Sequence, residues 1–402
     1  MSTRRLRIGI AGLGRAFSIM LPALESEKLE IVAGADPRPE ARERFAAEFK
    51  ARAYETVEDM CADTAVEAVY ISTPHGLHRA NVEAAAAAGR HILVEKPMAL
   101  KLEDCRAMTA AARAAGVIMV VGHSHSFDLP IRRAREIIAS GAVGELRMIT
   151  SAYYTDFLYR PRRREELDTS QGGGVMYNQA PHQVDVARLL GGGLVRSVRS
   201  NVGIWDAARP TEGAYQALLT FKSGASASLT YSGYAHFDGD ELVDWVTEGG
   251  LPKDPVRYGA TRRALAAASS IEDEERLKNR VNYGGEGYGG PQNAASGDAQ
   301  RHHQHFGLVI ASCSHADLRP TAKGVHVYAD SERRFEPLAS PMVYRDEVID
   351  ELYDAIVHGT PVVHDGEWGM ATMEVCLAML ASHAQGREIE LRHQVPVEGR
   401  RA

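Results

Sequence analysis

The feature that most constrains the fold is a regular alternation of short apolar runs and alanine-rich stretches over the first 125 residues. The apolar runs are continuous, which is typical of strands buried on both faces of a sheet. The stretches between them have the apolar spacing of helices. Strands that alternate with helices predict a parallel sheet covered on both faces, a doubly wound α/β domain. The expected strands are 7–11, 29–35, 66–71, 91–94 and 117–121, and the clearest helices are 39–50, 78–89 and 102–116.

From residue 126 onwards the pattern changes. A helix over 130–140 leads into segments in which apolar and polar residues alternate. Such alternation is typical of antiparallel strands with one face in solvent. We therefore expect two domains, a doubly wound one at 1–125 and an α+β one at 126–402 with a large, open, mainly antiparallel sheet. The expected strands lie near 146–155, 195–205, 215–221 and 225–234, and a helix runs from about 174 to the glycines at 191–193.

The second domain contains an insertion at about 235–305. Its part from 282 to 300 is rich in glycine and has no apolar period, so we expect a mobile loop there. Three histidines that follow, His302, His303 and His305, are expected to be solvated. Two amphipathic helices, at about 346–358 and 366–385, are expected near the end of the chain.

Composition excludes several classes of protein. With 46 Lys+Arg against 53 Asp+Glu the formal net charge is −7, so no overall positive field attracts nucleic acid or an anionic membrane surface. No apolar run is long enough for a spanning helix, and the basic N-terminus does not have the form of a signal peptide. The four cysteines are far apart and form no CxxC pair. This spacing indicates free thiols in a reducing cytoplasm.

The first expected strand is followed by a glycine turn that can bind a dinucleotide. Gly12 suits the sharp turn, and Gly14 lets the backbone approach a pyrophosphate at the start of a helix that begins with Arg15 and Ala16. Phe17 stands where glycine or alanine is usual, at a position that serves helix–strand packing. Strand, turn and helix together predict a cofactor site.

An acidic residue at the end of the second expected strand supports this interpretation. Asp36 lies where a carboxylate accepts hydrogen bonds from the ribose hydroxyls of adenosine. A 2′-phosphate would meet like charge there, so NAD is favoured over NADP, although Arg38 partly offsets this. The alternative is that an aspartate before Pro37 only forms a turn.

Polar residues also follow the next strand, at the edge of a parallel sheet where ligands bind. Ser72, Thr73, Pro74 and His75 end that strand, and His78 opens the helix after it. We expect all five to line the cofactor site.

The next strand ends with Glu95 and Lys96, and we expect both at the cofactor. Only eight of the 46 basic residues are lysines. A desolvated lysine can lose its proton and an arginine cannot, so Lys96 is a candidate for proton transfer. A surface ion pair between Lys96 and Glu95 is the structural alternative.

A third group of polar residues follows the glycines at 172–174. If a helix continues through Pro181, then Asn178 and His182 are neighbours on one face, with Asp185 one step further. A lone helical histidine is more often a core residue than a catalyst, so this pattern alone leaves both roles open.

Two further groups are candidates for the substrate pocket. His123 and His125 share one side of a strand end, but no third ligand is in evident register, so we expect pocket lining and no metal. Arg160 and Arg163 belong to an arginine-rich run just before the glycines at 172–174. This run is either a solvated loop or a binding site for substrate carboxylates.

Over nearly the whole chain, these motifs resemble the glucose–fructose oxidoreductase/inositol dehydrogenase family (Gfo/Idh/MocA). The residues that carry the resemblance are the Gly12-Leu13-Gly14 turn, Glu95-Lys96-Pro97, Gly172-Gly173-Gly174, Asn178, His182 and the ending at 386–391. The resemblance implies that Lys96 is the catalytic lysine and His182 its partner histidine. Asn178 stands where the family more often has an aspartate.

Within the family, the stretches 122–128, 258–280 and 305–313 resemble phthalate 4,5-cis-dihydrodiol dehydrogenases. This resemblance implies an NAD-dependent oxidoreductase that converts the cis-dihydrodiol of an aromatic carboxylate to a catechol, with Asn178 and the arginines at the substrate. A sugar or inositol dehydrogenase, an NAD-dependent glycosidase and a non-catalytic NAD-binding regulator are the alternatives. The family also implies a homo-oligomer, a dimer or tetramer, that acts on a small molecule.

Overall fold

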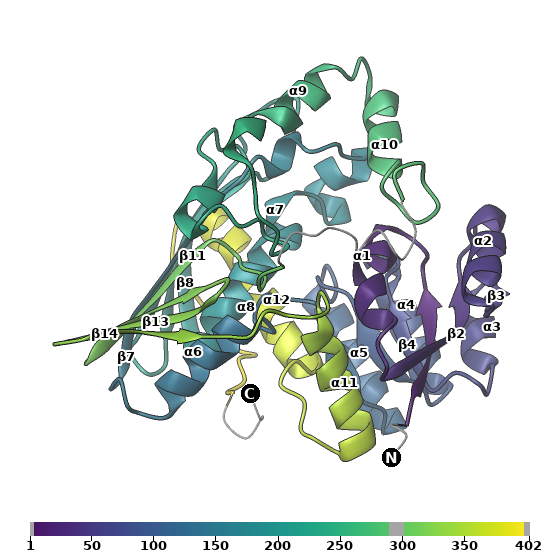
Figure 1. The fold of residues 1–402 in the computed structure, drawn as a ribbon, viewed down its shortest axis with the longest axis horizontal. Helices are drawn as coiled ribbons and strands as arrows, with labels where there is room; N and C mark the ends of the chain where they lie inside the picture. Colours follow the sequence, from purple (N-terminus) through teal and green to yellow (C-terminus); the bar gives the residue numbers. More distant parts are fainter. Residues whose placement is uncertain (1–3, 289–300, 398–402) are drawn as a thin grey trace.

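The structure is a computed structural model and describes residues 4–288 and 301–397. It contains two sheets, which lie on opposite sides of Figure 1. Six parallel strands form the first, in the order β3-β2-β1-β4-β5-β6, and nine mainly antiparallel strands form the second, in the order β14-β13-β12-β11-β7-β10-β9-β8-β15. The predicted fold class, a doubly wound parallel sheet with an α+β unit built on a large sheet, is confirmed.

The first sheet is buried on both faces, as its continuous apolar runs predict. Leu6, Ile8 and Ile10 of β1 pack in one apolar cluster, and Val69 and Ile71 of the neighbouring β4 pack in the other, so each face has its own core. The strands are β1 (Leu6–Ala11), β2 (Leu29–Ala35), β3 (Arg52–Tyr54), β4 (Ala68–Ile71), β5 (His91–Val94) and β6 (Met119–Val121). The helices are α1 (Arg15–Leu24), α2 (Pro39–Phe49), α3 (Val57–Ala62), α4 (His78–Ala87) and α5 (Leu102–Ala115).

The two predicted C-terminal helices are present as α11 (Asp346–His358) and α12 (Gly366–Gln385). Val348, Ile349 and Leu352 of α11 lie in the same apolar cluster as the strand residues of β1. A helix from the end of the chain therefore completes the core of the first sheet. The predicted division into domains at 1–125 and 126–402 stays a prediction.

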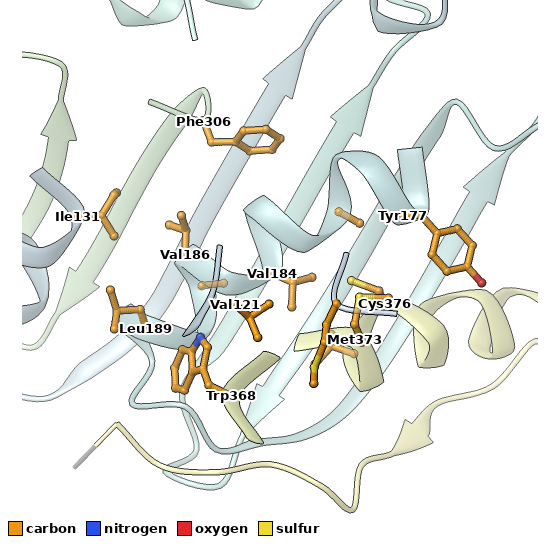
Figure 2. Packing of buried hydrophobic residues seen from close by; sticks show 14 of the residues in the cluster. Val121, Ile131, Tyr177, Val184, Val186, Leu189, Phe306, Trp368, Met373 and Cys376 are labelled. Atoms are coloured by element: carbon orange, nitrogen blue, oxygen red, sulfur yellow. The ribbon is translucent and has the colours of Figure 1, made fainter. Parts of the chain in front are cut away.

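The second sheet has one face covered by helices. Every residue of α8 (Ala180–Leu190) is buried, and Figure 2 shows its Val184 and Leu189 close to Trp368 and Met373 of α12. α6 (Leu129–Ala139) packs on β12 and β13 and α12 packs on β8, while the short α7 (Gly174–Asn178) lies against α8 and α12. The strands are β7 (Leu146–Tyr154), β8 (Val195–Gly203), β9 (Ala214–Phe221), β10 (Ser226–Ser232), β11 (Leu308–Cys313), β12 (Ala316–Thr321), β13 (Gly324–Ala329), β14 (Arg333–Pro337) and β15 (Ile389–Glu390).

The insertion forms an arch between the two units at the top of Figure 1. It contains α9 (Ala260–Ala266) and α10 (Ile271–Asn279). Short 3-10 helices occur at His75–Leu77, Phe157–Tyr159, Arg164–Leu167, Thr169–Gln171, Gly239–Val243 and Pro255–Arg257. None of the helices within 4–288 and 301–397 is long and apolar enough to cross a membrane.

Two expectations about the insertion were wrong. The first part of the expected mobile loop is packed, because the Tyr283 hydroxyl donates to Glu48 at 2.8 Å and its ring is buried. The remainder, 289–300, lies outside the described residues. His303 and His305 are buried, not solvated, and each ring bonds a backbone carbonyl, of Ala339 and Val246 respectively.

Tyr283 also explains the unusual residue in the glycine turn. The Phe17 ring lies 5.0 Å from that of Tyr283, 6.1 Å from that of Phe45 and 6.0 Å from that of Phe49, measured between centroids. A bulky residue at position 17 thus joins α1 to α2 and to the insertion, so it replaces close helix–strand packing with an aromatic cluster.

We expect Phe17→Ala to lower the free energy of unfolding by about 3–5 kcal/mol, because it removes a fully buried ring from this cluster. Urea unfolding followed by circular dichroism measures the change. Val256→Ala, at a position that is 86% exposed, is the control and should change the free energy by no more than about 0.5 kcal/mol. Equal stability of both variants would contradict the role of the cluster.

Candidate functional site

The turn after β1 has the geometry that a pyrophosphate needs. Gly12 has a φ of +90°, and a Cβ built on it would lie 3.0 Å from the carbonyl of Ser72. A Cβ built on Gly14 would have no described atom within 4 Å. Gly14 is the N-cap of α1 and carries no side chain to satisfy the first N–H groups of the helix. The cradle, with Arg15 and Ala16 behind it, therefore fits a dinucleotide phosphate.

Asp36 directly follows β2 and faces this turn. Its carboxylate accepts hydrogen bonds from the Leu13 N–H at 2.9 Å and from Nε and Nη2 of Arg38 at 2.9 and 3.0 Å. Burial acts against the charged form, but these hydrogen bonds outweigh it and hold the pKa of Asp36 below its usual value. An ionised carboxylate thus lies where the ribose hydroxyls of a bound dinucleotide are expected.

The residues after β4 divide into two groups. Ser72 bonds the carbonyl of Gly12 at 2.8 Å, so it holds the glycine turn, and Thr73 and Pro74 follow it along the same edge. The ring of His78 is buried and bonds the backbone carbonyls of Thr73, Pro97 and Met98. This places His78 between the ends of β4 and β5, with its ring occupied by backbone carbonyls.

His75 differs from His78 because its Nδ1 is buried without a hydrogen-bond partner among the described residues. Burial, with smaller contributions from His78 and Lys96, lowers the pKa of His75 to about 3. A neutral imidazole therefore lies within electrostatic reach of Lys96.

Lys96 follows β5 and reaches across to the second unit. Its Nζ donates to the backbone carbonyl of Asn178 at 3.0 Å. Burial lowers the pKa of Lys96, and the carboxylate of Glu95 opposes this without cancelling it. Glu95 is itself buried and accepts from the hydroxyl of Tyr70 at 2.6 Å. The alternative of a surface ion pair is therefore wrong.

The helical pairing of Asn178 with His182 was a wrong expectation. The helix breaks at Gln179, whose φ is −120°, because Pro181 lacks an N–H and its ring interferes with the preceding turn. The Asn178 amide turns back to the carbonyls of Gly172 and Gly174. Its contribution to the site is its own carbonyl, which accepts from Lys96.

Asp185 also lies off the expected face. Its carboxylate accepts from the Trp368 indole at 2.5 Å and from the hydroxyls of Thr372 and Ser126. It therefore joins α8 to α12 and to the segment after β6, a structural role.

His182 meets two groups from distant parts of the chain. Its ring centroid lies 4.8 Å from that of His125, and both rings are buried. Nδ1 of His125 bonds Asp128 at 2.7 Å, and Nε2 of His125 lies 3.6 Å from Glu248. Burial lowers the pKa of His182 well below its usual value, and the nearby charge of Lys96 acts in the same direction.

The charge state of His125 is set by two carboxylates. Burial acts against the charged ring, but Asp128 and Glu248 outweigh it and raise the pKa of His125. His123 is buried too, and burial lowers its pKa to about 3. Its ring stacks on Phe127 at 5.9 Å, and its Nε2 bonds Gln304 at 3.3 Å.

Aromatic rings form a wall beside these histidines. The Phe306 centroid lies 5.2 Å from those of His182, His125 and Tyr153, and 5.9 Å from that of Tyr231, on which it stacks. Sequence reasoning did not assign this wall. Its rings come from β7, β10 and the segment before β11, which only the sheet pairing brings together.

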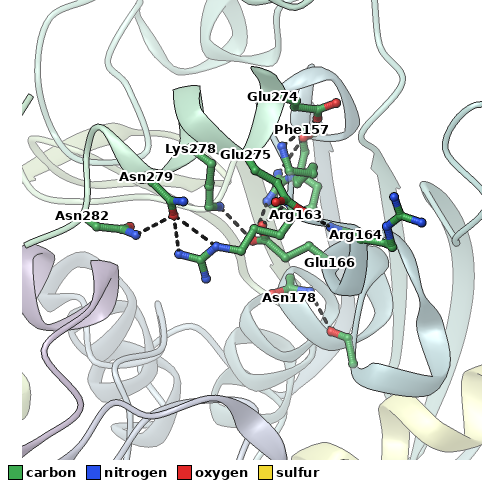
Figure 3. A network of polar contacts seen from close by, with 12 residues as sticks. Phe157, Arg163, Arg164, Glu166, Asn178, Glu274, Glu275, Lys278, Asn279 and Asn282 are labelled. Carbon is green, nitrogen blue, oxygen red and sulfur yellow. Dashed lines mark hydrogen bonds and ion pairs between the residues drawn. The ribbon is translucent and has the colours of Figure 1, made fainter. Parts of the chain in front are cut away.

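The arginine-rich run is held by the insertion (Figure 3) and is not a solvated loop. Arg162 is buried and lies 3.7 Å from the centroid of Phe157. Arg163 donates to Oδ1 of Asn279 at 2.9 Å, so its guanidinium is tied to α10. Arg160 bonds Asp156 at 3.5 Å and interacts electrostatically with Glu248, so it is the candidate that lies toward the histidines.

One arginine was missed by the sequence analysis. Arg345 precedes α11, has a φ of +63°, and its Nε is buried without a partner in the described part of the chain. Its charge acts on Glu95, Glu248 and His182. Only the packing of α11 beside the first sheet places it there, because it is 249 residues from Lys96 in the sequence (345 − 96).

The sequence matches two family models. The model described as "Oxidoreductase family, NAD-binding Rossmann fold" covers residues 6–123, and the GFO/IDH/MocA C-terminal domain covers residues 131–251. The chain belongs to the Gfo/Idh/MocA oxidoreductase family. The predicted class, an NAD-dependent oxidoreductase, is therefore confirmed.

Several members of this family are similar over most of their length. The 1-carboxy-3-chloro-3,4-dihydroxycyclohexa-1,5-diene dehydrogenase of Comamonas testosteroni is 48% identical over 379 residues, 93% of this chain and 94% of that protein. The trans-1,2-dihydrobenzene-1,2-diol dehydrogenase of Mus musculus is 30% identical over 232 residues, 56% of this chain and 68% of that protein. The crystal structure of a presumed dehydrogenase from Bordetella bronchiseptica RB50 covers 96% of this chain and 100% of its own, with a TM-score of 0.90 at 41% identity.

We expect Asp36→Ala to weaken NAD binding about tenfold, the effect of one lost charge-assisted hydrogen bond. The same change frees the Arg38 guanidinium to meet a 2′-phosphate, so the preference for NAD over NADP should narrow. Fluorescence titration with both dinucleotides measures this. Glu43→Ala, an exposed carboxylate on α2, is the control, and unchanged discrimination in Asp36→Ala would show that Asp36 is not at the ribose.

Proposed function

We propose that this enzyme oxidises the cis-dihydrodiol of an aromatic carboxylate to the catechol, with NAD as the hydride acceptor. The observation that carries the proposal is the wall of Phe306, Tyr231 and Tyr153 beside His182. Flat aromatic faces suit a planar cyclohexadiene ring. The Comamonas testosteroni relative supports the same class, since its name describes a dihydroxylated cyclohexadiene that carries a carboxyl group.

Lys96 is the proposed proton acceptor. A neutral amine accepts the proton of the reacting hydroxyl, and burial favours the neutral form. The carbonyl of Asn178 fixes the amine. Burial keeps His182 and His75 neutral, so neither ring adds a positive charge beside the amine, and His182 is the proposed partner of Lys96 as a neutral ring. The nicotinamide supplies the hydride acceptor when NAD is bound. The resulting hydroxyketone enolises to the catechol, and aromatisation makes the oxidation favourable.

Two arginines near Glu248 are the proposed binding groups for the carboxylate of the substrate. Arg345 has an unpartnered buried Nε among the described residues, and Arg160 lies toward Glu248. Guanidinium groups bind carboxylates in a bidentate manner. We assign the cofactor to Gly12, Gly14, Arg15, Ala16, Asp36, Arg38, Ser72, Thr73, Pro74, His75, Glu95 and Lys96.

The proposal includes a cytoplasmic homo-oligomer. Four free cysteines support a reducing compartment. Exposed Met148 and Leu218 on the uncovered face of the large sheet, with Ile204 and Trp205 just after β8, support association of subunits.

We expect Lys96→Ala to lower kcat by about 10²–10⁴-fold while the Kd for NAD changes little, because the base is lost and the glycine turn is intact.

In the wild type, kcat should rise with pH as Lys96 loses its proton. The midpoint should lie below 10.5, the ordinary lysine value, because burial lowers the pKa of Lys96. Stopped-flow measurement of NADH formation across pH tests both points. A Lys96→Ala enzyme with wild-type kcat would contradict the mechanism.

We expect NADH formation with cis-dihydrodiols of benzoate and phthalate, at a kcat/KM at least about 100-fold above that for inositol, glucose or galactose, because sugars lack the planar ring. Absorbance at the NADH band measures this. Preference for a polyol would assign the enzyme to the sugar dehydrogenases, and release of a sugar without NADH accumulation would assign it to the glycosidases. NAD binding without any turnover would indicate a regulator.

A further inference from the structure

Three potential metal ligands converge beside the aromatic wall. Within 4–288 and 301–397, one group of three such residues has the spacing of an ion site, and it consists of His125, His182 and Glu248. One ligand atom from each lies within 4.8 Å of the others, and both histidines are buried. The residues come from the segment after β6, from α8 and from the insertion.

The two imidazoles have unused nitrogens. Nε2 of His125 and Nδ1 of His182 are buried and have no hydrogen-bond partner in the described part of the chain. Buried polar atoms in folded proteins nearly always have a partner. Among the described residues, Nδ1 of His182 has no such partner, and Nε2 of His125 has only the Glu248 carboxylate at 3.6 Å. These nitrogens, on rings whose centroids are 4.8 Å apart, therefore indicate a missing binding partner.

Asp128 orients the first of these rings. It accepts from Nδ1 of His125 at 2.7 Å, which leaves Nε2 toward Glu248. Metal-bound histidines are usually held by a carboxylate in this manner. A doubly protonated His125 that bridges Asp128 and Glu248 is the alternative, but it leaves the nitrogen of His182 without a partner.

We propose that His125, His182 and Glu248 bind one divalent cation of the Zn²⁺ class. Two imidazoles and a carboxylate suit Zn²⁺, whereas Mg²⁺ and Ca²⁺ favour oxygen ligands. Ligands at about 2.1 Å in a tetrahedral site are about 3.4 Å apart, and the His125–Glu248 pair already stands at 3.6 Å. Three protein ligands leave one position open, which is typical of sites that also bind a substrate oxygen.

The open position lets the cation bind the substrate, and this part of the proposal rests on the proposed function. A hydroxyl oxygen of the dihydrodiol takes the fourth position and is thereby held next to the aromatic wall. Cation binding itself does not depend on the proposed function and can be measured without substrate.

The test uses the full-length protein after treatment with a chelator and removal of that chelator. Zn²⁺ is titrated against a chromophoric competitor, and Co²⁺ is followed by its visible absorption. We expect one equivalent of each and the intense bands of four-coordinate Co²⁺. Glu248→Gln should weaken binding at least 100-fold, and Asp128→Asn should weaken it about 10–100-fold, as for other carboxylates that support a ligand histidine.

Glu241→Gln, an exposed glutamate in the same insertion, is the matched control and should bind like the wild type. Thermal unfolding with and without Zn²⁺ is the second measurement, and Zn²⁺ should raise the Tm of the wild type but not of Glu248→Gln. Absence of stoichiometric binding by the wild type, or unchanged affinity in both variants, would overturn the proposal.

The outcomes separate this proposal from the proposed function. If the protein oxidises dihydrodiols but binds no cation, only the proposed cation site is contradicted. If the protein binds one equivalent of Zn²⁺ but oxidises no dihydrodiol, only the proposed function is contradicted.

Discussion

The site depends on one half-buried lysine whose amine donates to a backbone carbonyl. Lys96 belongs to the first unit and Asn178 to the second, so the 3.0 Å contact between them joins the two halves of the site. That carbonyl is available because the helix breaks before Pro181, so no later N–H of α7 or α8 needs it. Pro181 therefore contributes to the site indirectly, because the helix break leaves the Asn178 carbonyl free to accept from Lys96.

The insertion has a second structural role beside the substrate region. It holds the arginine-rich run through Glu274, which accepts from the Arg162 N–H at 2.7 Å, and it holds the turn that follows through Lys278, which donates to Glu166 at 2.8 Å. It also reaches the first unit, where Arg15 donates to the carbonyl of Val281 at 2.8 Å. Because Arg15 begins the helix of the glycine turn, the insertion joins the substrate side to the cofactor side.

The local parts of the site were predictable from the sequence. Gly12, Asp36 and Lys96 each follow a strand, and parallel strands bring their carboxyl ends to one edge. His78 shows the limit of that argument. It lies at the same edge, but three backbone carbonyls occupy its ring, and no sequence pattern shows which polar groups a histidine will satisfy.

The sequence by itself determined the doubly wound sheet, the glycine turn, the acidic residue after the second strand and the lysine at a strand end, because these follow from periodicity and from neighbours in the chain. Only the tertiary structure decided that Glu248 meets His125, that Phe306 stacks beside His182 and that Arg345 enters the site. Such contacts join residues more than 100 positions apart, and they depend on how helices and sheets pack. Packing is decided by the shapes of whole elements, which no local pattern contains.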